Sequence, residues 1–201
     1  GTVKVGIVSS FASRWLSARL TNFFEICPDL SLKIESINSI DEFSKANFSI
    51  AILWGDGWSD FEYELLMSSS SYILGNRKIY DHTKSLSLEE AMKKTPLLSD
   101  GFYGGHGGMK AWHKTANLEY KPSKSSLKIT DAFTRLQAVI DGQGIALWDE
   151  LVDEEIKSGK LFYISDIELQ GFGYHLVYKN KNALSIEEQK FRKWIKGVLQ
   201  K

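Results

Sequence analysis

Cysteine and proline are scarce in this sequence of 201 residues, which contains one cysteine, Cys27, and three prolines. A single cysteine excludes an internal disulfide framework and the paired-cysteine ligand sets of structural zinc sites. We interpret Cys27 as a small hydrophobic residue on the buried face of a helix. There is no apolar run long enough to cross a membrane as a helix, and no basic segment followed by an apolar one at the start. We therefore expect no membrane partner.

An excess of charge of either sign is also absent, because 25 Lys and Arg balance 25 Asp and Glu. This balance argues against a nucleic-acid-binding surface spread over the chain. The hydrophobic content of 43% and the charged content of 25% are ordinary for a soluble globular protein. The length allows one large domain or two small lobes.

The chain is organised around its first segment, which changes from strand to helix within a few residues. Val3, Val5, Ile7 and Val8 are apolar and β-branched, as in a strand, whereas apolar residues recur every three or four positions from Leu16 to Cys27, as in a helix. We expect Ser9 to Ser13 to form the turn between them. The first N–H groups of such a helix favour an anion or a carbonyl oxygen at the end of the sheet. The alternative is that Ser10 or Ser13 serves only as the helix N-cap.

Two further strands are expected in the first half of the chain, at Leu30–Ile37 and at the continuous apolar run Phe48–Trp54. Such a run is typical of a buried parallel strand. A short polar turn or helix, Ile40–Asn47, separates them. Trp54 would stand at the same edge of the sheet as Ser10, either as a lid over a bound molecule or as a plug for the loop that follows.

The second half repeats the alternation of strands and helices. Tyr63–Leu74 is expected to be extended. Capping boxes begin at Ser87 and Ser185, and Asp131 is expected to cap a helix. The further expected strands are Pro96–Asp100, Ser126–Thr130, Gly144–Leu147, Leu161–Ile164 and Gly173–Tyr178; the further expected helices run from Asp131 to Gly142, from Asp149 to Ser158 and onward from Ser185. Thr130 and Asp131 hold the place that Ser9 and Ser10 hold in the first half. The last strand and helix should return to pack near Val3–Ile7. This alternation predicts an α/β fold.

Signatures of catalysis, nucleotide binding and metal binding are weak. The glycine-rich stretch 101–108 has neither the Walker spacing nor GxGxxG after a strand. His106 and His113 are seven residues apart, whereas a helical metal site normally has ligands four apart and further ligands beside them. We interpret both histidines as facing solvent, and expect no metal and no cofactor. No nucleophile, base and orienting group can be identified together, so we do not expect an enzyme.

Three segments carry a resemblance to a known family. SSFASRWLSARLTNFFEICPDLSLKI, PLLSDGF with MKAWHKTANL, and DAFTRLQAVIDGQGIAL occur in the family's order, and GYHLVY with an amphipathic helix closes the chain. Together they resemble the effector-binding domain of LysR-type transcriptional regulators, in the branch of the glycine-cleavage activator and the β-lactamase regulators. The resemblance covers nearly the whole chain.

The resemblance implies two α/β lobes joined by two crossing segments, the fold of type 2 periplasmic binding proteins. Lobe I would comprise residues 1–68 and 173–201, and lobe II residues 69–172. A small effector would bind in the cleft between them. The residues implied at that site are Ser9, Ser10, Phe11, Trp54, Asp100, Thr130, Asp131 and Tyr174.

The sequence departs from the family's pattern at several positions next to these site residues. Ser99 stands where the branch usually has histidine, Leu53 stands where it often has arginine, and Ala132 and Phe133 replace small hydroxyl residues. The loss of a cation and of hydroxyl groups indicates an effector that is bulkier, more aromatic or less anionic than those of relatives.

The family also implies partners. Its members bind DNA through an N-terminal winged helix-turn-helix domain, which this chain lacks, and work in the cytoplasm as homodimers, with tetramers possible for the full-length protein. The dimer would place Arg14–Ile26 and Ser31–Ile37 of one copy against the helix near Asp149–Ser158 of the other. Arg19 would then face four acidic residues, Glu150, Asp153, Glu154 and Glu155. An exported solute-binding protein with the same fold is the alternative.

Overall fold

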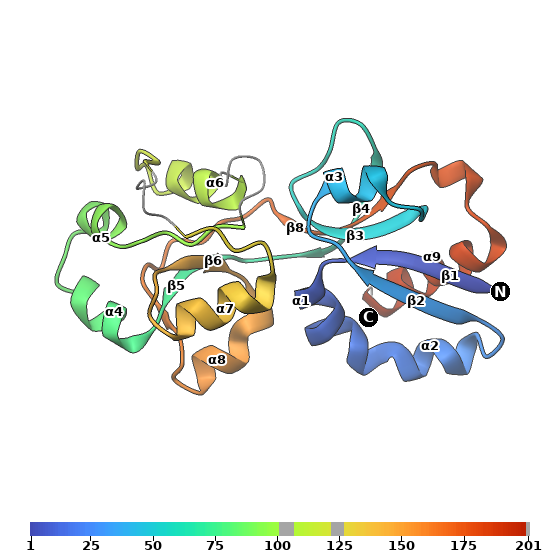
Figure 1. Ribbon diagram of the computed structural model, residues 1–201, viewed down its shortest axis with the longest axis horizontal. Helices are drawn as coiled ribbons and strands as arrows, with labels where there is room; N and C mark the ends of the chain where they lie inside the picture. Colours follow the sequence, from blue (N-terminus) through green and yellow to red (C-terminus); the bar gives the residue numbers. More distant parts are fainter. Residues whose placement is uncertain (101–106, 122–126, 200–201) are drawn as a thin grey trace. The chain divides into compact units, whose positions relative to one another are not determined.

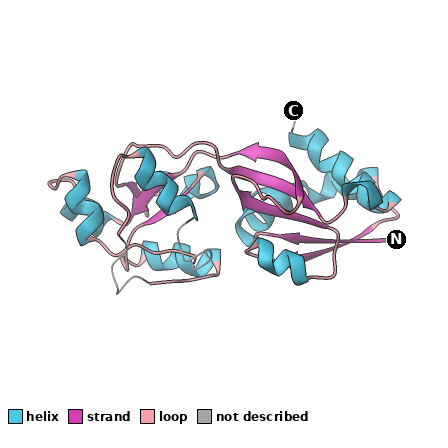
Figure 2. Cartoon of the chain, turned by 90° about the horizontal axis from the view of Figure 1, so that it is seen from above, coloured by secondary structure: helices cyan, strands magenta, loops and turns pink. Residues whose placement is uncertain are grey.

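The computed structural model describes residues 1–100, 107–121 and 127–199. The chain forms two compact units. Unit 1 consists of Gly1–Ser68 and Gly173–Lys201, and unit 2 consists of Ser69–Phe172. Both contain a β-sheet with helices packed against it, so the predicted α/β class is confirmed (Figures 1 and 2). His106 and Ser126 lie outside the described residues.

Unit 1 is built on a five-stranded sheet with the order β2-β1-β3-β8-β4. Its strands are β1 (Thr2–Ile7), β2 (Ser31–Ser36), β3 (Ile50–Gly55), β4 (Glu62–Ser68) and β8 (Gly173–Tyr178). β1 pairs in parallel with β2 and β3, whereas β8 runs antiparallel between β3 and β4. The alternating apolar residues of β1 and the apolar run of β3 are fully buried, which explains why both segments form inner strands.

Helices cover both faces of this sheet (Figure 1). On one face, α3 (Ile40–Lys45) inserts Phe43 into a cluster that contains Phe48 and Val177. On the other face, α2 (Leu20–Ile26) meets α9 (Ile186–Leu199) through the rings of Phe23 and Trp194, whose centroids are 5.1 Å apart. As predicted, α9 contacts β1. The core of unit 1 thus lies between its central strands and these three helices.

A charged cluster fastens α9 to the edge strand β4. The carboxylate of Glu64 accepts hydrogen bonds from Tyr178, from the guanidinium of Arg192 at 2.7 Å and from the ammonium groups of Lys181 and Lys196. The Glu64 side chain is only about a fifth exposed. One half-buried carboxylate therefore binds the phenol at the end of β8, a lysine of the following loop and two cations of α9.

The predicted turn at Ser9–Ser13 is wrong. α1 (Ser9–Phe11) begins directly after Val8, which is the N-cap and has no capping side chain. A π-helical turn, Ala12–Leu16, and a 3-10 turn, Ser17–Arg19, lead without a break into α2. Ser10 and Ser13 are therefore helical residues and not N-caps. Cys27 follows the last residue of α2. It is half-buried, whereas we expected it to be buried.

Unit 2 contains a smaller sheet with the order β6-β5-β7, in which both pairs are antiparallel. The strands are β5 (Tyr72–Gly75), β6 (Ala146–Trp148) and β7 (Phe162–Tyr163). The helices are α4 (Arg77–Thr83), α5 (Leu88–Lys94), α6 (Gly107–Thr115), α7 (Ala132–Ile140) and α8 (Asp153–Lys157), the last preceded by a 3-10 turn at Glu150–Val152. Leu74, Leu136 and Trp148 belong to the core that joins the sheet to α7 and α8.

Several expected strands are shorter than predicted. Tyr63–Leu74 is extended over most of its length, as predicted, but it forms two strands, β4 and β5, which belong to different units. Pro96–Asp100 contributes only isolated bridges, Leu97 to Ile145 and Ser99 to Lys128. The predicted helix caps are correct at Ser87, Asp131 and Ser185, where each side chain accepts the N–H three residues on.

Candidate functional site

Five of the eight predicted site residues gather at one edge of the sheet of unit 1. Ser9, Ser10 and Phe11 follow the carboxyl end of β1, and Trp54 lies near the carboxyl end of the adjacent strand β3. Tyr174 is directly opposite Trp54 in the antiparallel pair formed by β3 and β8, so both side chains are on the same face of the sheet. Ligands of open α/β sheets bind outside the carboxyl ends of the strands.

Aromatic contacts hold this edge together. The ring of Phe11 lies 4.9 Å from that of Tyr174 and 5.0 Å from that of Trp15, with which it is stacked. Phe11 and Tyr174 are buried, whereas Trp54 is half-buried. The edge therefore combines a rigid aromatic wall with a partly accessible indole.

The hydroxyl of Ser9 is buried and has no hydrogen-bond partner in the described part of the chain. Ser10, in the same first helical turn, is also buried. A buried hydroxyl without a partner costs free energy that a ligand group can recover. The start of α1 is therefore a place where polar groups of the protein are available for binding.

The other three predicted residues gather in unit 2, around the guanidinium of Arg135. Asp100 and Asp131 both act electrostatically on Arg135, whose pKa is lowered by burial and raised in part by these two carboxylates. Thr130 immediately precedes Asp131, and its backbone carbonyl accepts a hydrogen bond from Arg135 at 3.5 Å. The bridge between Ser99 and Lys128 brings the segment that carries Asp100 beside the segment that leads to Thr130.

Asp131 is held in place as the N-cap of α7. Its carboxylate accepts the backbone N–H and the hydroxyl of Thr134, both at 2.8 Å. These bonds, the backbone one foremost, lower the pKa of Asp131. Asp131 thus stays ionised at neutral pH, and its Oδ2 atom is already engaged by its own helix.

Sequence reasoning missed Arg135. It donates to the carbonyl of Ile129 at 2.8 Å and lies over the indole ring of Trp148 at 5.3 Å. It is the residue that orients the turn carrying Thr130. The spacing of Asp131 and Arg135, four positions apart across the start of a predicted helix, is the signal that could have indicated it.

The interpretation of His113 as a solvent-facing residue is wrong. His113 is 2% exposed, and its Nδ1 lies 2.8 Å from the carbonyl oxygen of Met109. Burial lowers its pKa. His113 packs among Trp112 and Tyr120 as part of the core of unit 2.

Neither metal binding nor membrane insertion receives support from the described residues. Among them, no group of three or more His, Cys, Asp and Glu side chains is arranged to hold a metal ion. None of the helices in that part of the chain has both the length and the apolar character needed to cross a bilayer.

Comparison with curated proteins identifies transcriptional regulators as relatives. The glycine cleavage system transcriptional activator of Escherichia coli K12 is 24% identical over 198 residues, which are 97% of this chain and 64% of that protein. The transcriptional regulator BlaA of Proteus vulgaris is 25% identical over 203 residues, which are 96% of this chain and 64% of that protein. The chain thus spans less than two thirds of the length of these relatives.

Solved structures show the same fold. The effector domain of the regulator AmpR of Pseudomonas aeruginosa has a TM-score of 0.81 at 20% identity, with 99% of this chain and 95% of that one covered. The regulatory domain of CrgA from Neisseria meningitidis has a TM-score of 0.74 at 17% identity, with 99% and 98% covered. The model of the LysR substrate binding domain matches residues 1–200. With a family match over nearly its whole length, and with relatives that are LysR-type regulators, this chain belongs to the LysR substrate-binding domain family.

Proposed function

We propose that this chain is the effector-sensing and dimerisation part of a LysR-type transcriptional regulator that acts in the cytoplasm and catalyses no reaction. The DNA-binding activity would reside in a winged helix-turn-helix domain outside this chain, in keeping with its zero net charge. The relatives support this proposal because they are transcriptional regulators. They do not favour the alternative of an exported solute-binding protein.

The single observation that carries the proposal is the convergence of the predicted site residues within each unit. Residues far apart in sequence, such as Phe11 and Tyr174, are in contact at the sheet edge of unit 1. In unit 2, Asp100 and Asp131 face the same guanidinium. We propose that each of these two groups supplies contacts to a small-molecule effector.

The chemistry of the two groups defines the class of effector. Hydroxyls and first-turn N–H groups at Ser9 and Ser10 suit a polar or acidic group. The nearby indole of Trp54 suits an apolar or aromatic body. Arg135 already donates to Ile129 and Thr130 and is faced by two carboxylates, so it is poorly placed to bind a strongly anionic ligand. We propose an effector with one polar anchor and a bulky or aromatic body.

Replacing the hydroxyl residues tests this site. A thermal-shift screen of metabolites first identifies an effector, and titration calorimetry then compares Ser10→Ala and Thr130→Ala with the parent. Loss of one hydrogen bond to a charged group costs about 1.5–3 kcal/mol, so each variant should bind about ten- to a hundred-fold more weakly. Ser13→Ala, at an exposed position of the same helical run, is the matched control and should bind normally. Normal binding by both test variants would show that the effector binds elsewhere.

We also propose that two copies associate through α2 and β2 of one copy and the α8 region of the other. Phe24, Ile26 and Ile34 present exposed apolar side chains on the first surface. The acidic side needs a correction, because Glu155 is only 7% exposed and cannot form a surface ion pair. Glu150, Asp153 and Glu154, which are exposed, remain as partners for Arg19. Such charge pairs orient an interface more than they strengthen it.

A further inference from the structure

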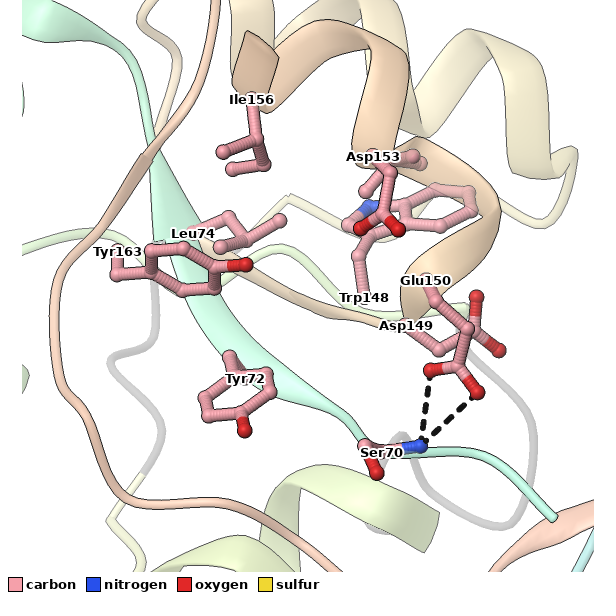
Figure 3. A pocket seen from close by; sticks show the side chains of 10 residues that line it. Ser70, Tyr72, Leu74, Trp148, Asp149, Glu150, Asp153, Ile156 and Tyr163 are labelled. Carbon is pink, nitrogen blue, oxygen red and sulfur yellow. Dashed lines mark hydrogen bonds between the residues drawn. The ribbon is translucent and has the colours of Figure 1, made fainter.

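We infer that unit 2 carries a second binding pocket, separate from the eight predicted site residues, that takes a small organic cation with an apolar or aromatic body. The pocket is a cavity of about 220 Å³ between β5, β6, β7 and the start of α8 (Figure 3). It lies wholly within unit 2, and its lining includes none of the eight predicted site residues. The inference does not rest on the proposed effector site.

The walls of this pocket are largely apolar and aromatic. Leu74, Val152 and Ile156 supply aliphatic surface. Tyr72 and Tyr163 meet edge to face, with ring centroids 5.1 Å apart, and line another side. Aromatic faces attract organic cations through the ring quadrupole. The walls therefore favour a ligand that combines an apolar body with positive charge.

The rim of the pocket is acidic, and none of the residues that line it is a lysine or an arginine. Glu150 accepts the backbone N–H of Ser70 at 2.9 Å, and Asp153 lies one helical turn further along. Within the described part of the chain, neither carboxylate forms an ion pair. Nearby carboxylates also act on the hydroxyl of Tyr72. Its pKa is raised by burial, then by Glu168 and further by Glu150. A cationic ligand group would be attracted to Glu150 and Asp153 and would offset their negative charge.

Trp148 supplies an independent indication of a ligand. Its side chain is 7% exposed, and its indole Nε1 is buried without a hydrogen-bond partner among the described residues. Figure 3 shows this nitrogen on the side of the ring that faces the cavity. Buried indole N–H groups usually have an acceptor. The missing acceptor and the unpaired carboxylates together indicate a ligand with a cationic nitrogen and a neutral oxygen.

Tyramine is a suitable probe because it carries a primary amine, an aromatic body and a phenolic oxygen. Titration calorimetry of the purified chain should show saturable binding at one site. Its analogue 3-(4-hydroxyphenyl)propionate, which has a carboxylate in place of the amine, should not bind, because it would meet Glu150 and Asp153 with like charge. Light scattering at the same concentrations should show an unchanged oligomeric state.

Two variants and one control locate the site. Asp153→Asn removes an exposed charge and should weaken tyramine binding about three- to five-fold, the range of an exposed ion pair. Trp148→Phe keeps the aromatic packing, removes the N–H and should weaken binding about tenfold, the value of one hydrogen bond. Asp166→Asn changes an exposed carboxylate of unit 2 that does not line the pocket, and it should bind as the parent does.

The outcomes distinguish the inference from simple charge attraction. Absence of tyramine binding at millimolar concentration would overturn it, as would equal losses of affinity in Asp153→Asn and Asp166→Asn. Binding of the carboxylate analogue with equal affinity would likewise overturn the assignment of a cation. Because none of these variants alters the eight predicted site residues, effector binding at that site can fail or succeed independently.

Discussion

At the scale of single residues, Glu64 stands out because its carboxylate forms ion pairs with three cations, Lys181, Arg192 and Lys196. Burial alone would raise its pKa, but hydrogen bonds from Arg192, Tyr178, Lys196 and Lys181 lower it far below the ordinary value. Because the folded-state pKa is depressed, the stabilisation is fully present above the unfolded pKa and is lost as the pH falls. Glu64 thus holds α9 against β4, and protonation of Glu64 at low pH should weaken this attachment.

Replacing Glu64 should destabilise unit 1. Glu64→Gln leaves three cations close together without their counter-charge, which should cost about 2–4 kcal/mol in the free energy of unfolding at pH 7. Urea denaturation of the parent and the variant measures this difference. Glu62→Gln, an exposed position on the same strand, is the control and should change stability by less than about 0.5 kcal/mol. Equal stability of parent and Glu64→Gln would show that solvent already screens the cluster.

The same pair of proteins should respond differently to acid. Since the ordinary carboxyl pKa is 4.5, the stability difference between the parent and Glu64→Gln should hold above about pH 5 and shrink progressively below about pH 4.5. Denaturation curves between pH 3 and pH 8 measure this dependence. A difference that is constant down to pH 3 would contradict the assigned role of the ionised carboxylate.

At the scale of elements, two glycines should give opposite results when changed to alanine. A Cβ on Gly144 would lie 2.4 Å from the carbonyl oxygen of Pro96, which accepts the N–H of Ile145. Gly144→Ala should therefore separate the 96–98 segment from β6 and cost about 1–3 kcal/mol. A Cβ on Gly197 in α9 meets nothing within 4 Å, so Gly197→Ala should stabilise by about 0.5–1 kcal/mol. Thermal and urea unfolding check both signs, and a neutral Gly144→Ala would contradict the close packing.

The elements that the sequence predicted well are those with a strong local signal. The apolar runs of β1 and β3 and the caps at Ser87 and Asp131 follow from residues within a few positions of one another. The turn at Ser9 was misjudged because helices can begin without a capping side chain, as here at Val8. Pro96–Asp100 was overestimated because a strand needs a partner along its length, and here only isolated bridges form.

At the scale of the whole molecule, association should depend on the apolar side chains of α2 and β2. The isolated chain should be a dimer at micromolar concentration in light scattering. Ile26→Lys places a charge on the proposed interface and should shift the population to monomer by at least about tenfold in dissociation constant. Ile186→Lys is the control, since Ile186 is similarly exposed, at 69% against 62%, but lies at the start of α9. A monomeric parent, or equal effects of both variants, would count against the proposed surface.

The assembly of the candidate site within unit 1 depends on topology that no local pattern encodes. Phe11 and Tyr174 are in contact although more than 160 residues separate them in the sequence. Their proximity requires β8 to insert antiparallel beside β3. The sequence led us to expect that the last strand returns to this unit, but it indicated neither the direction of that strand nor its neighbours. Arg135 went unrecognised because its partners are backbone carbonyls, which any sequence would supply.

The insertion of β8 between β3 and β4 has a consequence for how the protein is made. Unit 2 is a continuous stretch of chain, whereas the sheet of unit 1 needs a strand that the ribosome delivers only after unit 2 has been completed. Until then β3 and β4 each present an open strand edge, and open edges invite pairing with other chains. Nascent unit 1 is therefore the part of this protein that most needs shielding by chaperones, and slow release of the C-terminal segment should prolong that need.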